Sequence, residues 1–259
     1  MTTDQPLLIA KGVTKHYGAR TGCEDVSFEL YPGEILAVVG ESGSGKTTLL
    51  NGLSCRLPLT GGQVSYRMRD GTLRNLASLT EAERRFLMRT DWGFVHQNPA
   101  DGLRMRVSAG ANIGERMMAV GVRHYGRIRE TADDWLTRVE INAGRIDENP
   151  ASFSGGMRQR LQIARNLVSH PRLVFMDEPT GGLDVSVQAR LLDLLRALVG
   201  EMGLSAILVT HDLAVARLLS HRMMVMKDGR VVETGLTDRV LDDPRHPYTQ
   251  LLVASILEV

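Results

Sequence analysis

A glycine-rich stretch near the N-terminus has the residue types and the spacing of a phosphate-binding loop. Gly40-Glu41-Ser42-Gly43-Ser44-Gly45-Lys46-Thr47 fits the pattern G-x-x-x-x-G-K-[ST]. Glycine adopts positive φ at little cost, so such a loop can turn its backbone N–H groups toward an anion at the start of a helix. We expect Lys46 to reach the β- and γ-phosphates of a nucleotide and the Thr47 hydroxyl to ligate Mg²⁺. Thr48, the next residue, is counted with the binding loop.

Two adjacent carboxylates follow a second apolar run. The run Leu173-Val174-Phe175-Met176 predicts a buried strand that ends at Asp177 and Glu178. Sites of α/β proteins gather at the carboxyl ends of strands, so these side chains are placed for chemistry. We expect Asp177 to hold Mg²⁺, directly or through water, and Glu178 to orient and polarise an attacking water.

Two further polar residues end predicted strands. Gln97 closes the short run that begins at Trp92, where its amide could reach a metal or water. His211 follows the apolar run Ala206–Thr210. A lone histidine is usually structural, but this one ends a strand of the same predicted sheet, which favours a γ-phosphate contact.

Two other features have a functional and a structural interpretation. Tyr17 could stack on a nucleotide base or be an ordinary half-buried strand tyrosine, and its position does not separate these. Ser154-Gly155-Gly156-Met157 runs into a helix that continues through Leu167, so this turn could form a second anion site at a helix N-terminus.

These residues need a layered α/β scaffold to hold them. Ile35–Val39 predicts the buried strand before the phosphate loop, and the residues from Thr48 to Leu53 predict the helix after it. Further expected elements are strands at Leu7–Ala10, Val26–Leu30 and Gln63–Tyr66, a helix started by a Thr80–Glu83 capping box, an amphipathic helix at Val187–Val199, and a hairpin turning at Asp228-Gly229.

The stretch from Asp101 to about Gly144 predicts a helical subdomain inserted into this scaffold. It is rich in arginine and methionine and has helical apolar spacing. Met117-Met118 could be core or part of a docking surface for a partner. We choose Arg104, Arg106 and Arg116 as candidate contacts for that partner, because arginine is enriched at interface hot spots.

Composition narrows the class of protein. The chain has 259 residues and a net charge of +1, which gives no reason to expect nucleic acid as a partner. Cys23 and Cys55 lack metal-ligand spacing and suggest a reducing compartment. No apolar run is long enough to span a bilayer, and the first residues lack the regions of a signal peptide. We expect a cytoplasmic protein without direct membrane insertion.

The chain resembles the ATP-binding-cassette (ABC) ATPases over nearly its whole length. The matching motifs come in the family's order: the aromatic A-loop at Tyr17, Walker A at Gly40–Thr47, the Q-loop at Gln97, the signature at Ser154-Gly155-Gly156, Walker B at Leu173–Asp177 with Glu178, the D-loop at Asp184 and the switch at His211. One residue departs from the family pattern, because Met157 stands where the signature usually has glutamine.

The resemblance implies a fold and an activity. The fold is an α/β P-loop ABC ATPase, in which a RecA-like core sheet is joined by an N-terminal antiparallel β subdomain and an inserted α-helical subdomain. The whole chain would be one ABC domain, with residues 1–100 and 145–259 as catalytic core and 101–144 as the helical subdomain. The activity is Mg²⁺-dependent hydrolysis of ATP, with Gln97, Glu178 and His211 as catalytic residues.

The implied assembly is a head-to-tail homodimer. In the family, the signature of one protomer, including Ser154 and Gly156, faces the γ-phosphate bound by Lys46 of the other. Asp184 would contribute to the nucleotide site through the D-loop.

Within the family, two branches compete. The residues from Gly181 to Leu195 and the ending His246-Pro247-Tyr248-Thr249 look like the oligopeptide- and nickel-importer branch. The stretch from Val95 to Arg116, with Arg123-His124-Tyr125-Gly126, is similar instead to ABC proteins of the bacterial phosphonate carbon–phosphorus lyase system, and the chain stops soon after Leu252. That likeness implies docking on the lyase core complex, with a second ABC protein of the system as a further partner. Translation- and repair-type ABC proteins carry a second cassette or a long coiled coil, which this sequence lacks.

Overall fold

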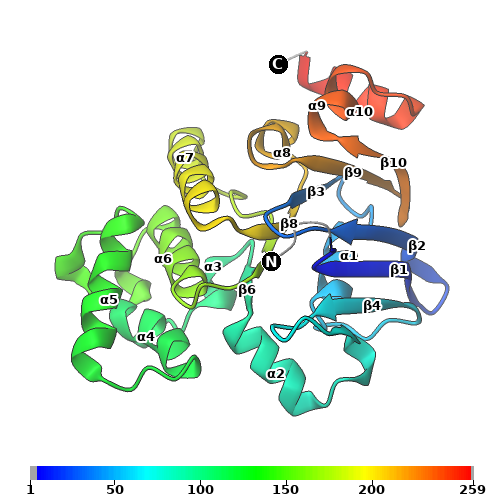
Figure 1. Ribbon diagram of the computed structural model, residues 1–259. Helices are drawn as coiled ribbons and strands as arrows, with labels where there is room; N and C mark the ends of the chain where they lie inside the picture. Colours follow the sequence, from blue (N-terminus) through cyan, green and yellow to red (C-terminus); the bar gives the residue numbers. More distant parts are fainter. Residues whose placement is uncertain (1–4, 258–259) are drawn as a thin grey trace. The chain divides into compact units, whose positions relative to one another are not determined.

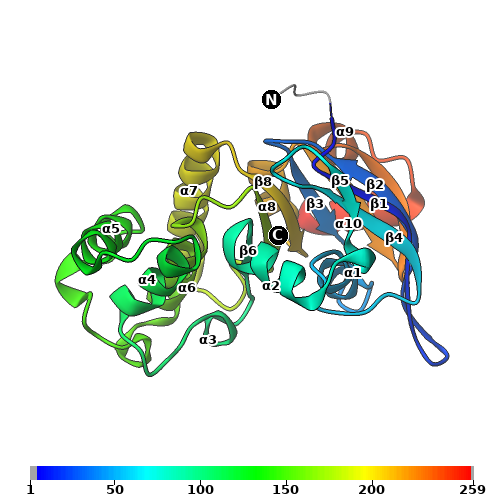
Figure 2. The ribbon, with the colours of Figure 1, turned by 60° about the horizontal axis from the view of Figure 1, so that its bottom comes forward.

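The computed structural model describes residues 5–257, which fall into two compact units. Unit 1 comprises residues 5–84 and 203–257, and unit 2 comprises residues 85–202. Both units contain strands and helices, which are drawn in Figures 1 and 2. The α/β class predicted from the sequence is therefore confirmed.

Unit 1 begins with an antiparallel sheet of strand order β2-β1-β4-β5. The strands are β1 (Leu8–Tyr17), β2 (Arg20–Leu30), β4 (Gly61–Arg67) and β5 (Leu73–Asn75), and the 3₁₀ turn η1 (Leu76–Ser78) follows. The predicted strands are confirmed and are longer than expected, because hydrogen-bonded pairing continues past the apolar runs. Tyr17, the last residue of β1, pairs with Arg20 where β1 turns into β2.

The second set of strands in unit 1 has the order β10-β9-β3-β8. It consists of β3 (Ile35–Val39), β8 (Ser205–Thr210), β9 (Arg222–Lys227) and β10 (Arg230–Leu236). Strand β3 runs parallel to both neighbours and is buried at every residue, as expected for a central strand covered on both faces. Asp228 and Gly229, with φ of 49° and 81°, form the predicted β9–β10 turn.

The helices of unit 1 are α1 (Lys46–Leu53), α8 (Leu213–Leu219), α9 (Thr237–Asp242) and α10 (Pro247–Leu257). Helix α2 (Glu81–Thr90) crosses from unit 1 into unit 2. Its capping box is present: Thr80 Oγ1 accepts the Glu83 N–H at 3.3 Å, and the Glu83 carboxylate accepts the Thr80 N–H at 2.8 Å.

Unit 2 combines two parallel strands with five helices and two 3₁₀ turns in residues 85–202. The strands are β6 (Trp92–Val95) and β7 (Leu173–Asp177). The helices are α3 (Pro99–Gly102), α4 (Ala109–Ala119), α5 (Tyr125–Arg138), α6 (Gly155–Leu167) and α7 (Val185–Met202), and the turns are η2 (Ala143–Arg145) and η3 (Pro150–Ser152).

Helices α4, α5 and α6 lie against one another (Figure 1). Gly114 of α4 allows close packing on α5, and Gly110 allows the close approach of Ile146, the residue after η2. A Cβ at Gly114 would come within 2.7 Å of Ile128, and a Cβ at Gly110 within 2.5 Å of Ile146. The helical character expected for residues 101–144 is thus present.

Two expectations for this helical region are resolved by burial. Met117 is 6% exposed and belongs to the core, whereas Met118 is 46% exposed. The choice of Arg116 as a docking residue is wrong, because its side chain is buried. Its guanidinium donates to the backbone carbonyls of Met88 at 2.7 Å and Trp92 at 2.5 Å, and burial lowers its pKa to about 10.

Candidate active site

The phosphate loop in unit 1 has the backbone that its glycines predict. Gly40, Gly43 and Gly45 have φ of 147°, 84° and 99°, values that side chains disfavour. A Cβ at Gly40 would lie 2.2 Å from the Met226 carbonyl oxygen, and one at Gly45 would lie 2.0 Å from that of Gly22. At Gly40 and Gly45, both the positive φ and the lack of room for a Cβ therefore require glycine.

Lys46 opens helix α1 and folds back into this loop. Its side chain is buried, and Nζ donates to the carbonyl oxygens of Gly40 at 2.7 Å and Glu41 at 2.8 Å. Ser44, also buried, has its hydroxyl 3.5 Å from Nζ. The ammonium thus lies among the loop residues at a helix N-terminus, an arrangement that suits the phosphates of a nucleotide.

Tyr17 lies beside the first turn of helix α1. A Cβ added to Gly22 would come within 2.9 Å of the Tyr17 ring and 2.7 Å of the Thr48 methyl group, so both side chains pack over this glycine. The Tyr17 side chain is 48% exposed. The structure therefore places an aromatic ring with accessible surface next to the phosphate loop.

His211 leaves the sheet next to the same loop. Strands β3 and β8 are parallel, and Val39 is in register with Thr210. Gly40 and His211 are therefore the next residues of two neighbouring strands. Asp212 accepts the N–H groups of Ala214 and Val215 and caps helix α8, which fixes the backbone just after His211.

In unit 2, Gln97 and the carboxylates of Asp177 and Glu178 lie at the ends of two neighbouring strands. Strands β6 and β7 are parallel with Val95 opposite Met176, so Gln97 and Glu178 follow neighbouring strand ends. A Cβ at Gly181 would lie 3.4 Å from the Gln97 amide nitrogen, which places that side chain against the turn after Glu178.

Glu178 has a backbone conformation that non-glycine residues rarely adopt. Its φ is 45°, and the Gly181 N–H donates to its carbonyl oxygen at 2.9 Å to close a tight turn. Such conformations cost on the order of 1–3 kcal/mol and cluster at functional sites. The turn presents the Glu178 side chain at the end of β7.

The signature turn and the D-loop lie together in unit 2. Ser154 caps helix α6 by accepting the Met157 N–H at 3.3 Å. A Cβ at Gly156 would come within 2.6 Å of Val187, and one at Gly155 within 3.8 Å of Leu183, so the turn packs on the segment that contains Asp184. The Met157 sulfur lies 3.3 Å from a guanidinium nitrogen of Arg145, which shows where this atypical side chain points.

The predicted site residues therefore form two groups, one on each unit. Unit 1 gathers Tyr17, the phosphate loop with Lys46 to Thr48, and His211. Unit 2 gathers Gln97, Asp177, Glu178, the signature turn and Asp184.

The family model described as "ABC transporter" matches residues 23–181 of this chain. The chain belongs to the ABC transporter family. As a member of this family, it is an ATP-binding ABC ATPase that hydrolyses ATP.

Two curated relatives are similar to this ABC ATPase over nearly its whole length. It is 65% identical over 255 residues to the phosphonates utilization ATP-binding protein PhnK of Escherichia coli (strain K12), covering 98% of this chain and 99% of the relative. It is 38% identical over 264 residues to the dipeptide transport ATP-binding protein DppF of the same strain, covering 98% of this chain and 77% of DppF.

Solved ABC cassettes have the same fold. A dimeric structure of the ATP-binding cassette MJ0796 bound to ADP and Pi matches with a TM-score of 0.78 and 29% identity, over 89% of this chain and 98% of that one. The structure of cbiO1 from Clostridium perfringens, part of the ABC transporter complex cbiONQ, matches with a TM-score of 0.75 and 25% identity, over 93% and 92% of the two chains. The ABC fold predicted from the sequence is confirmed.

Within residues 5–257, no helix of this ABC ATPase is long and apolar enough to cross a membrane.

Sequence reasoning missed three residues that support these groups. Gln159 and Gln162 on α6 are buried against the backbone next to Gln97, and the Tyr248 hydroxyl accepts the Glu41 N–H at 3.0 Å. The one available signal for Tyr248 was the motif His246-Pro247-Tyr248-Thr249, which pointed to a branch of the family and not to the phosphate loop. Nothing in the sequence distinguished the glutamines from exposed helix residues.

Proposed function

We propose that this ABC ATPase docks on the core complex of a carbon–phosphorus lyase and couples ATP hydrolysis to phosphonate breakdown. The observation that carries this proposal is the 65% identity to PhnK, which extends over 98% of this chain and 99% of the relative. The likeness to DppF is weaker and leaves about a quarter of DppF unmatched. A second candidate, the ATPase subunit of an oligopeptide or nickel importer, rests on that weaker likeness.

The proposed chemistry assigns each site residue a role. Lys46 and the loop N–H groups bind the β- and γ-phosphates, Tyr17 stacks on the base, and Glu178 polarises the attacking water as general base. His211 contacts the γ-phosphate, and Gln97 helps to place the water.

Mg²⁺ is the proposed cofactor, because each unit offers hard oxygen donors for it. The Thr47 hydroxyl, the Asp177 carboxylate and the Gln97 amide oxygen are hard oxygen donors, the class that Mg²⁺ prefers. The ion would neutralise charge on the β- and γ-phosphates during hydrolysis. The phosphate loop itself fits the nucleotide, because its glycines have the φ values and the close backbone approach described above.

We further propose that the active unit is a head-to-tail homodimer. Two matching cassette structures, of MJ0796, are dimeric. Ser154, Gly155, Gly156 and Asp184 of one protomer would then complete the site of the other, and two-fold symmetry would build both sites alike.

The docking surface is proposed on the helical region of unit 2. Arg104 and Arg106 are exposed and remain candidates for contact with the lyase core, whereas Arg116 is replaced by the exposed Arg123. Charge reversal of exposed arginines should remove the partner without disturbing the fold. A second ABC protein of the same system is a further proposed partner.

The test is affinity purification of the tagged protein followed by identification of what co-purifies. Recovery of lyase subunits with the parent, lost in the triple variant Arg104→Glu/Arg106→Glu/Arg123→Glu, is the expected result. A matched control reverses three exposed arginines outside this region, Arg20, Arg69 and Arg239. Recovery of permease subunits instead would assign the protein to the importer alternative.

A further inference from the structure

Two glutamines of helix α6 bind the backbone next to the proposed catalytic glutamine. Gln159 and Gln162 are 1% and 0% exposed. Gln162 accepts the His96 N–H at 2.7 Å and donates to the His96 carbonyl at 3.1 Å, so it holds both backbone groups of the residue before Gln97. Gln159 donates to the same carbonyl at 3.2 Å.

Gln159 also bonds to the backbone beside Glu178, the proposed general base. Its amide nitrogen donates to the carbonyl oxygen of Pro179 at 2.8 Å, in the residue directly after Glu178. One buried amide group therefore joins the residue before Gln97 to the residue after Glu178.

The orientation of the two amides is fixed by their partners. The His96 N–H requires an oxygen, so the Gln162 nitrogen must point the other way, to the His96 carbonyl and to the Gln159 oxygen at 3.1 Å. The Gln159 nitrogen is then left for the two carbonyls, His96 and Pro179. Turning either amide over would set oxygen against oxygen in a buried place, which is costly.

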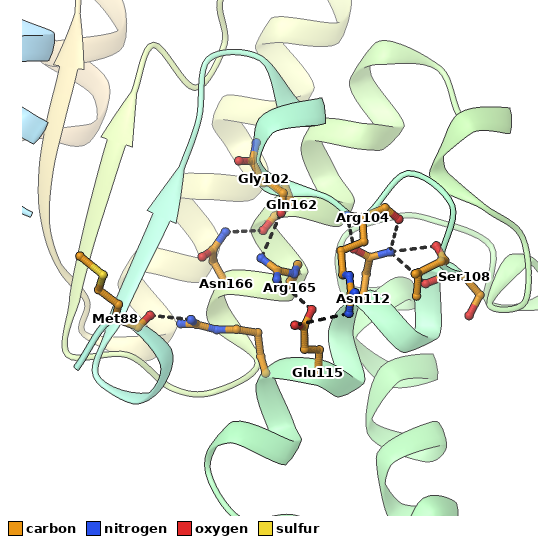
Figure 3. Close-up of polar contacts among 11 residues, drawn as sticks. Met88, Gly102, Arg104, Ser108, Asn112, Glu115, Gln162, Arg165 and Asn166 are labelled. Carbon is orange, nitrogen blue, oxygen red and sulfur yellow. Dashed lines mark hydrogen bonds and ion pairs between the residues drawn. The ribbon is translucent and has the colours of Figure 1, made fainter. Parts of the chain in front are cut away.

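The chain packs closely around these amides. A Cβ on Gly102 would come within 2.2 Å of the Gln162 side-chain oxygen, so the segment after Gln97 lies directly on this glutamine. Arg165, on the same helix, donates to the Gly102 carbonyl at 3.0 Å and holds the segment from the other end. Figure 3 shows Gln162, Arg165 and Asn166 in this region.

A third amide on α6 provides an internal comparison. Asn166 accepts the Phe94 N–H at 2.9 Å and donates to the Phe94 carbonyl at 3.0 Å, as Gln162 does at His96. Strand β6 ends its sheet, and these side chains satisfy backbone groups that a further strand would otherwise pair. Asn166 thus covers the edge of β6, and its hydrogen bonds go to Phe94 and to the Gln162 carbonyl, not to the residues beside Gln97 or Glu178.

We propose that Gln159, supported by Gln162, is a positioning residue that sets the distance between Gln97 and Glu178. Both catalytic roles are those of the proposed function, on which this inference rests. Glu178 has positive φ, so its side chain needs neighbours that hold the backbone in place, and the Gln159–Pro179 bond is one of them. Loss of the amide lets the two segments drift apart and misplaces the attacking water.

The test compares Gln159→Met with Asn166→Leu in the purified full-length protein. Each substitution removes one buried amide of α6 and keeps a side chain of similar length. Gln159→Met should lower kcat by about 10- to 100-fold, as small misplacements of catalytic groups do, with the Kd for ATP within about twofold of the parent. Asn166→Leu should lower thermal stability to a similar extent and keep kcat within about twofold.

The Glu178→Gln background separates positioning from general damage. A residue that acts through Glu178 should matter little once Glu178 is disabled, so Gln159→Met should reduce the residual rate less than twofold there. An equal loss of kcat in both backgrounds, or an equal loss in Asn166→Leu, would overturn the positioning role. Gln162→Met removes its own two bonds to the His96 backbone and the donor that orients the Gln159 amide, so it replaces Gln159→Met if that variant does not fold. Gln162→Met should likewise lower kcat and leave the Kd for ATP within about twofold of the parent. A parent-like kcat in this variant would also overturn the proposal.

The same variants distinguish failure of the proposed general base from failure of the positioning role. If Glu178→Gln alone keeps the parent kcat, the assignment of the general base fails. If Glu178→Gln lowers kcat by about 100-fold or more while a folded Gln159→Met keeps the parent kcat, the base stands and the positioning role fails.

Discussion

The Tyr248 hydroxyl accepts the backbone N–H of Glu41 at 3.0 Å, across 207 residues of sequence. Tyr248 is buried in the core of unit 1 near β3 and β9, and Glu41 is the second residue of the phosphate loop. The first turn of α10 is thereby bonded to the loop that we propose binds phosphate. This hydrogen bond links the C-terminal segment directly to the backbone of the proposed nucleotide site.

Replacing Tyr248 by Phe should weaken ATP binding about 2- to 10-fold, because a neutral hydrogen bond is worth about 0.5–1.5 kcal/mol. Titration with a fluorescent ATP analogue measures the change. The control is Tyr31→Phe, which removes a hydroxyl that donates to Glu29 at 2.7 Å on the surface of the same unit. Equal affinities in the two variants would show that the Tyr248 hydroxyl does not shape the loop.

Lys46→Ala should remove most of the affinity for ATP. The ammonium is buried among the carbonyls of Gly40 and Glu41, where its charge would be close to the phosphates in the proposed binding mode. Isothermal titration calorimetry gives the affinity, and Lys11→Ala, at an exposed position, is the matched control. Parent-like binding by a folded Lys46→Ala variant would refute the phosphate-loop assignment.

Glu178→Gln should lower ATP turnover by about 10²–10⁴-fold, the usual effect of losing a general base. The amide keeps the shape and hydrogen bonding of the carboxylate, so ATP binding should survive. ATP-bound dimers should accumulate, because they form and are not hydrolysed. Phosphate release and size-exclusion chromatography measure the two effects, and an unchanged turnover would move the base to another residue.

Mixed dimers test the shared site. A Lys46→Ala protomer retains its signature turn, and a Ser154→Arg protomer retains its phosphate loop. A head-to-tail pair of the two keeps one composite site with both halves intact, so about half of the binding sites should be restored relative to a parental dimer. If folded mixed dimers bind no ATP in that site, the shared-site arrangement is wrong.

Arg116→Met should lower the free energy of unfolding by about 2–4 kcal/mol, because the buried carbonyls of Met88 and Trp92 lose their donor. Arg106→Met, at an exposed position, should change it by less than about 0.5 kcal/mol. Urea denaturation followed by circular dichroism measures both. Equal stabilities would mean that the carbonyls find other donors.

The sequence by itself determined the features that depend on neighbouring residues. The phosphate loop from Gly40 to Thr47, the strand Ile35–Val39, the Thr80–Glu83 capping box and the Asp228-Gly229 turn are each contiguous, and the chemistry of a few adjacent residues dictates their backbone. The order of such motifs along the chain was enough to identify the ABC family and its fold.

The tertiary structure alone decided which polar side chains point inward. Arg116 has the same residue type as its exposed neighbours, yet the packing of α4 buries it against the carbonyls of Met88 and Trp92. The contacts of Gln159 with His96 and Pro179 span 63 and 20 residues of sequence. Such partners are backbone groups, which every residue carries, so no pattern of residue types reveals them before the chain is folded.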